Sequence, residues 1–123
     1  MEAIRLQPTQ KTPEISFSRD GRLLMKGNSI PEHSTDFFKP LCDWLDEYVK
    51  KPAGITEFTI QMNYINSSSS KYLMMMLKIL EKADSASSRV FVNWEYEEDD
   101  FSLQELGEEF QSELKIPINF VLI

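Results

Sequence analysis

The sequence contains one cysteine, Cys42, and one histidine, His33. A single cysteine excludes an internal disulfide and is typical of a reducing compartment. A single histidine leaves almost no ligands for a zinc site and no basis for a histidine-centred catalytic triad. Carboxylates alone could still hold magnesium, so counting does not exclude that ion. On balance we expect neither a cofactor nor a metal in this chain.

Basic residues and long apolar runs are also scarce. Lys and Arg number 13 against 20 Asp and Glu, which gives a net charge of −7. No segment concentrates the basic residues as binding to a phosphate backbone requires, so we expect no nucleic-acid partner. A membrane span needs about 18 consecutive apolar residues, and no such run occurs. Residues 1–5 lack the apolar region of a signal peptide. We therefore expect a cytoplasmic protein with no membrane insertion.

The chain does contain enough apolar surface for a compact domain. Hydrophobic residues make up 41% of its 123 residues, and domains commonly have roughly 100 to 150 residues. We expect a single domain over residues 1–123. Residues 1–14 carry Pro8 and Pro13 with little periodicity, so they are predicted to be an extended lead-in without secondary structure of its own.

Periodicity predicts eight elements after this lead-in. They are two hairpin strands around Asp20-Gly21, a helix over 34–51, a strand over 55–65, a helix over 67–83, a strand over 90–97, a helix over 102–114 and a strand over 118–123. Strands that alternate with helices in this way indicate parallel pairing in the later part of the sheet. The predicted fold class is α/β, a single-domain mixed sheet with an N-terminal hairpin and with helices mainly on one face.

Two details of this pattern can be compared with the structure. The first helix follows three polar residues, Ser34, Thr35 and Asp36, and any of them could cap its first turn. In the strand over 55–65, one alternating set of side chains is apolar or aromatic, which predicts a buried face. That set consists of Phe58, Ile60, Met62 and Tyr64.

A run of four serines, residues 67–70, lies where a strand is predicted to end and a helix to begin. Serine and asparagine side chains accept hydrogen bonds from the free N–H groups of a first helical turn, so capping explains one or two of them. A functional hydroxyl cluster is the other interpretation. A phosphate here would lie at the positive end of the helix dipole and could be accommodated without unfolding the domain.

A helical wheel of residues 67–83 separates a core face from an outer face. The core face comprises Tyr72, Leu73, Met76, Leu77, Ile79, Leu80 and Ala83. Methionine adapts to varied surfaces, so an exposed methionine pair on the outer face predicts a partner-binding surface. We assign to that surface the outer-face residues and the residue before the helix: Asn66, Lys71, Met74, Met75 and Lys78. Coverage of the two methionines by another element remains the alternative.

Several short motifs, in one order, carry a family resemblance over nearly the whole chain. They are Thr12-Pro13, Gly21 with Leu23, Gly27-x-Ser29-x-Pro31-Glu32, Trp44-Leu45 and Tyr64-Ile65-Asn66-Ser67-Ser68-Ser69-x-Lys71. With these motifs the chain resembles the SiaC-type regulatory phosphoproteins. Their fold is similar to that of the anti-sigma-factor antagonists, so the resemblance implies a STAS-like fold.

The resemblance also implies a function. In that family, the hydroxyl residue after the motif asparagine is phosphorylated by a GHKL-type kinase and dephosphorylated by a PP2C-type phosphatase. That residue is Ser67 here, where the family usually has threonine, and Ser68 and Ser69 are alternative acceptors. The unphosphorylated family protein binds and activates a diguanylate cyclase, in cyclic-di-GMP and biofilm signalling. We therefore expect a phosphorylation-controlled binding switch that is not an enzyme.

Two other functions remain as alternatives. An anti-sigma-factor antagonist would use the same switch but would bind a GHKL-type anti-sigma kinase. A small metal-dependent hydrolase would use the acidic cluster that includes Glu95 and residues 97–100. This cluster lacks the spacing and the glycine of a calcium loop, and a solvated edge that caps the third helix explains it more simply.

Overall fold

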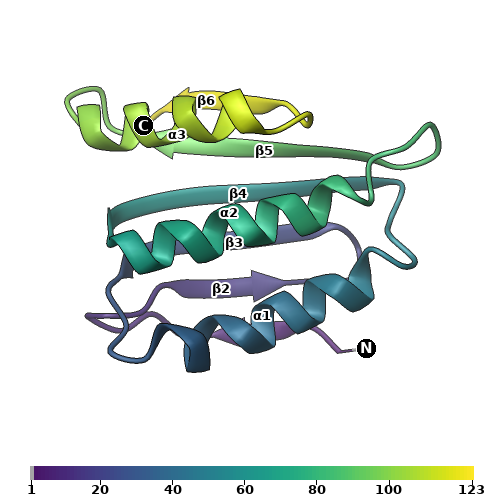
Figure 1. The fold of residues 1–123 in the computed structure, drawn as a ribbon, viewed down its shortest axis with the longest axis horizontal. Coiled ribbons are helices and arrows are strands. Elements are labelled where there is room, and N and C mark those ends of the chain that lie inside the picture. The colour runs from purple at the N-terminus through teal and green to yellow at the C-terminus, as the bar shows by residue number, and fades with distance from the viewer. Residues whose placement is uncertain (1) are drawn as a thin grey trace.

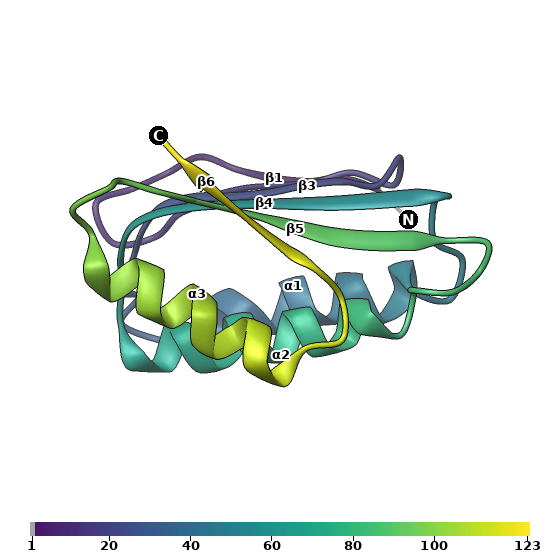
Figure 2. The same cartoon turned by 90° about the horizontal axis from the view of Figure 1, so that it is seen from above.

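Six strands form one sheet, and three helices cover one face of it, in the computed structural model, which describes residues 2–123 (Figure 1; Figure 2). The elements in chain order are β1 (Ile4–Leu6), β2 (Glu14–Phe17), β3 (Arg22–Ser29), α1 (Ser34–Tyr48), β4 (Ile55–Ile65), α2 (Ser67–Glu81), β5 (Arg89–Tyr96), α3 (Phe101–Glu113) and β6 (Ile118–Leu122). Seen from above in Figure 2, all three helices lie on the same side of the sheet, which confirms the predicted fold class.

The strands lie across the sheet in the same order as along the chain. β1, β2 and β3 pair antiparallel, whereas β3, β4, β5 and β6 pair parallel. Parallel neighbours need a crossover, and α1, α2 and α3 supply the three that this order requires. The predicted combination of a hairpin with later parallel strands is therefore confirmed.

The hairpin turn between β2 and β3 depends on Gly21, whose φ is +100°. A side chain is disfavoured in that region of backbone conformation. A Cβ on Gly21 would also lie 2.0 Å from the carbonyl oxygen of Ile55. The glycine of the predicted Asp20-Gly21 turn thus allows both the positive φ and the close approach of the chain that enters β4.

β1 lies within the segment that was predicted to have no secondary structure of its own, so that prediction was wrong for Ile4–Leu6. Ile4 is opposite Phe17 in the antiparallel ladder with β2. The indole N–H of Trp44 donates a hydrogen bond of 2.7 Å to the carbonyl oxygen of Glu2, which ties the start of the chain to α1. A strand of three residues is too short to show alternation in a sequence.

Helix α1 begins without the predicted cap. His33 is its N-cap residue and makes no side-chain capping hydrogen bond. The hydroxyls of Ser34 and Thr35 instead share hydrogen bonds with those of Ser68, at 2.7 Å, and Tyr72, at 2.6 Å. The first turns of α1 and α2 are thereby joined.

The core lies between the sheet and the helices. Its largest fully buried side chains include Trp94, Phe17, Phe38, Phe58, Leu73, Met76 and Leu77. In α2, Leu80 is also buried as predicted, as is Ala83 just beyond the helix, but Tyr72 and Ile79 are only half-buried. The helices have 13 to 15 residues, and within residues 2–123 none is long and apolar enough to cross a bilayer.

Candidate functional site

The passage from β4 to α2 is fixed by Asn66, the N-cap residue of α2. Its backbone N–H donates to the carbonyl oxygen of Ser29 at 3.0 Å. Its side-chain oxygen accepts a hydrogen bond of 2.9 Å from the backbone N–H of Ser69. Such a cap satisfies one of the free donors of the first turn, so Asn66 sets where the helix begins.

The side chains in the serine run have different environments. Ser69 is fully buried. Its hydroxyl donates to the carbonyl oxygen of Ser29 at 3.1 Å and accepts from the Ser29 hydroxyl at 2.7 Å. The half-buried Ser68 donates to the side-chain oxygen of Asn66 at 3.2 Å and also shares a hydrogen bond with Ser34. Both hydroxyls are thus committed to contacts within the protein.

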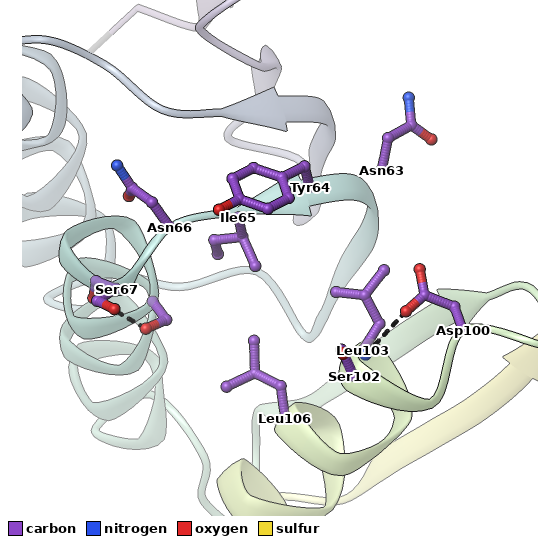
Figure 3. Close-up of a pocket in the computed structure, with 10 residues that line it drawn as sticks. Asn63, Tyr64, Ile65, Asn66, Ser67, Asp100, Ser102, Leu103 and Leu106 are labelled. Atoms are coloured by element: carbon purple, nitrogen blue, oxygen red, sulfur yellow. Dashed lines mark hydrogen bonds between the residues drawn. The ribbon is translucent and has the colours of Figure 1, made fainter.

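Ser67 is the first residue of α2 and is exposed. Its hydroxyl takes part in none of the hydrogen bonds found within residues 2–123. Its carbonyl oxygen accepts a hydrogen bond of 2.9 Å from the hydroxyl of Ser70, one turn further along the helix. Figure 3 shows Ser67 at the side of a hollow, opposite residues of α3. Among the hydroxyls of Ser67, Ser68 and Ser69, that of Ser67 alone is exposed and outside these internal hydrogen bonds.

The hollow beside Ser67 is a pocket of about 370 Å³ between the start of α2 and the start of α3 (Figure 3). One side is formed by the end of β4 and the start of α2, and the other by the first turns of α3. Its lining residues are Asn63, Tyr64, Ile65, Asn66, Ser67, Ser70, Asp100, Ser102, Leu103 and Leu106. Exposed side chains of Tyr64 and Phe101 lie at this end of the molecule, with 58% and 69% of their surface accessible.

A second hollow continues along the same two helices, with a volume of about 270 Å³. Its lining residues are Ser70, Lys71, Met74, Leu106, Glu109, Phe110 and Glu113. The two hollows share Ser70 and Leu106. We call the combined feature the α2/α3 groove.

Helix α3, the second wall of the groove, is held against the sheet by Trp94 of β5. The indole N–H of Trp94 donates a hydrogen bond of 2.9 Å to the carbonyl oxygen of Leu103. Gly107, one turn later, allows close packing, because a Cβ there would lie 2.7 Å from Trp94 Nε1 and from Phe120 Cε1. The side chain of Asp100 caps the helix by accepting from the backbone N–H of Leu103 at 3.1 Å.

The structure divides the residues that were predicted to bind a partner. Asn66, Lys71 and Met74 line the α2/α3 groove together with Ser67. Met74 is half-buried against the core, so the expected exposed pair is reduced to Met75, which is 50% accessible.

Lys78 is exposed but makes contacts within the protein. Its ammonium group donates to the carbonyl oxygen of Glu113 and lies 3.6 Å from the carboxylate of Glu81. The same Glu81 carboxylate accepts from the backbone N–H of Lys115. These contacts join the last turn of α2 to the end of α3. Lys78 therefore joins the two helices at the end of the groove that Glu113 lines.

Most of the groove residues were not predicted from the sequence as part of the site, among them Tyr64, Asp100, Leu103 and Leu106. Tyr64 was expected on a buried strand face, but β4 pairs with β5 only as far as Gln61, and Tyr64 lies beyond this pairing. Its exposure corrects that prediction. A polar capping residue followed by an exposed aromatic, Asp100-Phe101, was a sequence signal for the start of the second wall.

The acidic cluster lies at the start of α3, and Cys42 is buried in α1. Within residues 2–123, no group of three or more His, Cys, Asp or Glu side chains is placed to hold a metal ion. Asp100 caps α3, as the simpler interpretation of the acidic cluster predicted. Burial, with Asp46 and Asp43 nearby, raises the pKa of the Cys42 thiol, which disfavours the reactive thiolate.

Comparison with known proteins agrees with the fold and with the family resemblance. The sequence profile of the SiaC family regulatory phosphoproteins matches residues 6–123. An uncharacterised protein of Pseudomonas aeruginosa (strain UCBPP-PA14) is 32% identical over 118 residues, which are 95% of this chain and 94% of that protein.

Solved structures of SiaC from Pseudomonas aeruginosa have the same fold. Apo-SiaC is 32% identical, with a TM-score of 0.87 over 98% of this chain and 99% of the other. SiaC in the crystal structure of the diguanylate cyclase SiaD with its activator SiaC is 31% identical, with a TM-score of 0.86 over the same shares of the two chains. The chain therefore belongs to the SiaC family of regulatory phosphoproteins.

Proposed function

We propose that this protein is a phosphorylation-controlled binding switch whose acceptor is Ser67, and that its unphosphorylated form binds and activates a diguanylate cyclase. The observation that carries the proposal is the difference among the serines. The Ser67 hydroxyl is exposed beside the α2/α3 groove, whereas those of Ser68 and Ser69 bond within the protein. A kinase can reach Ser67 without unfolding α2.

A phosphate on Ser67 is compatible with the folded protein. The backbone N–H groups of the first helical turn have no partners within the helix, and the helix dipole favours negative charge there. The modification adds roughly −1.5 to −2 charges at pH 7. Because Ser67 lines the groove, this charge changes a surface and leaves the core intact. The result is a binding switch.

The two alternative acceptors fit less well. Phosphorylation of Ser69, which has 0% of its surface accessible, would break both of its hydrogen bonds to Ser29 and force the first turn of α2 from the sheet. Phosphorylation of Ser68 would break its links to Ser34 and Asn66. Either event would lower the stability of the folded protein, whereas modification of Ser67 leaves these hydrogen bonds in place.

Family membership supports the proposed partners. SiaC of Pseudomonas aeruginosa, which is 31% identical to this chain, is the activator of the diguanylate cyclase SiaD in their complex. That complex supports a cyclase as the partner of this protein too. The SiaC-type resemblance adds a GHKL-type kinase and a PP2C-type phosphatase that act on Ser67. In this proposal the protein is itself not an enzyme.

Mass spectrometry after incubation with the cognate GHKL-type kinase tests the acceptor. We expect one phosphate, located on Ser67, and its removal by the PP2C-type phosphatase. Ser67→Ala should abolish phosphorylation, and Ser70→Ala, one turn away on the same groove, is the matched control that should retain it. Equal phosphorylation of the Ser67→Ala protein would overturn the assignment.

A further inference from the structure

We propose that the α2/α3 groove binds an amphipathic α-helix of the partner, which presents apolar residues to the floor of the groove and Lys or Arg side chains to α3. This inference rests on the proposed function, because it places the partner beside Ser67. It adds the chemistry and the conformation of the segment that docks.

The groove has the length of a short helix. Its lining residues run along α3 from Ser102 to Glu113. At a rise of about 1.5 Å per residue, this stretch of α3 is about 16 Å long. A helix of about three turns, on the order of 11 residues, spans the same distance.

The floor of the groove is apolar. α3 contributes Leu103, Leu106 and Phe110, which recur at helical spacing, and α2 contributes Met74. Leu106 and Met74 are half-buried, so each retains apolar surface that a partner can cover. Exposed apolar surface with a polar rim is typical of binding sites, and methionine adapts its shape to a partner.

The acidic charge of the α3 wall indicates which charged residues the docked helix should carry. α3 carries four glutamates and no lysine or arginine between Phe101 and Glu113. Glu109 and Glu113 line the groove, while Glu105 and Glu108 are exposed outside it. Lysine or arginine on the docked segment would complement the α3 wall, which would repel acidic residues. On the facing α2 wall, Lys71 is the one basic residue within residues 2–123 that lines the groove.

A helix fits this groove better than an extended segment. An added strand needs a free sheet edge, and the edges of this sheet are β1 and β6. Both walls of the groove are helices, whose backbone groups are bonded internally. A docked helix likewise satisfies its own backbone and needs only side-chain contacts.

The position of Ser67 explains how phosphorylation would release such a helix. Ser67 and the apolar residues Ile65 and Leu103 line the same end of the groove. A doubly charged phosphate there must lose water when an apolar side chain covers it, which is unfavourable. The acidic residues Glu109 and Glu113 lie at the other end, where the basic residues of the partner would bind.

The test uses unphosphorylated full-length protein and a synthetic probe of about three helical turns, with leucines on one face and lysines along one flank. NMR titration should shift the signals of Leu106 and Met74 and leave those of Leu24 and Phe91, on the uncovered sheet face, unchanged. A matched probe with glutamate in place of lysine should bind at least tenfold more weakly.

Charge-swapped variants test the same contact from the side of the protein. The double variant with Glu109→Lys and Glu113→Lys should bind the lysine probe at least tenfold more weakly and the glutamate probe more tightly. Glu108→Lys, on the same helix but outside the groove, should change the affinity for each probe less than threefold. The inference would be overturned if the lysine probe did not bind, or if the NMR shifts fell on the uncovered sheet face. It would also be overturned if the swapped and control variants changed the affinities equally. The acceptor experiment on Ser67 stands apart from these outcomes, since no kinase is used here.

Discussion

The hydroxyl of Ser69 donates to the carbonyl oxygen of Ser29 and accepts a hydrogen bond from the hydroxyl of the same residue. Through this pair, the first turn of α2 is fastened to the end of β3, 40 residues earlier in the chain. The attachment directs one side of the turn into the core. Ser67 is left on the other side, facing the groove. The geometry of the proposed switch therefore depends on a buried contact that is not itself modified.

Removing the Ser69 hydroxyl should destabilise the protein. Ser69→Ala leaves the buried Ser29 hydroxyl without its acceptor, and an unsatisfied buried group costs about 1–3 kcal/mol. Ser70→Ala removes a hydroxyl that is only half-buried and bonds locally, so it should cost less than about 0.5 kcal/mol. Urea unfolding of both variants measures the difference. Equal losses of stability would contradict the structural role of Ser69.

The cap at Asn66 gives a second prediction. Asn66→Ala removes the acceptor for the backbone N–H of Ser69, and loss of such a cap costs about 0.5–2 kcal/mol. Asn66→Asp keeps an oxygen in place and should retain most of the stability. Thermal unfolding compares the two variants with the unmodified protein. A destabilisation by aspartate as large as that by alanine would rule out capping as the role of this side chain.

Close packing at Gly107 gives a third prediction. The higher helix propensity of alanine should by itself stabilise α3 by about 1 kcal/mol in the Gly107→Ala variant. The added Cβ nevertheless meets Trp94 and Phe120 at 2.7 Å, and overpacking of this kind costs about 1–3 kcal/mol. We expect a net loss of stability and altered tryptophan fluorescence. Gly54→Ala, where a Cβ meets nothing within 4 Å, is the control and should leave the fluorescence unchanged.

The contact at Lys78 gives a fourth prediction. Lys78→Ala removes a contact of a half-exposed side chain, so global stability should fall by less than about 1 kcal/mol. Local opening is a more sensitive measure, because few interactions join the ends of α2 and α3 there. Hydrogen exchange should become faster at the end of α3 in this variant. Lys82→Ala, at an exposed position one turn further along, should leave that exchange unaltered.

Much of the fold could be predicted from the sequence, because its signals are local. The apolar alternation of β4 and the helical spacing in α2 give the correct element types, and Gly21 occurs at the predicted turn. The errors occur where tertiary contacts decide. β1 is too short to show a period, and the hydroxyls expected to cap α1 bond to α2 instead.

The lining of the groove was predicted only in part for the same reason. Ser67 and Asn66 belong to one continuous segment, so sequence reasoning could find them together. The second wall comes from α3, more than 30 residues later, and its distance from Ser67 depends on the packing of Gly107 against Trp94. Lys78 resembled a surface residue on a helical wheel, but the carbonyl oxygen that it contacts belongs to Glu113.

Diguanylate cyclase activity tests the central claim most directly. The cognate cyclase is titrated with unphosphorylated protein, with protein phosphorylated on Ser67 by its kinase, and with the Ser67→Ala variant. We predict full activation by the unphosphorylated and Ser67→Ala proteins, and at least tenfold weaker activation by the phosphorylated form. Equal activation by the phosphorylated and unphosphorylated proteins would contradict the account.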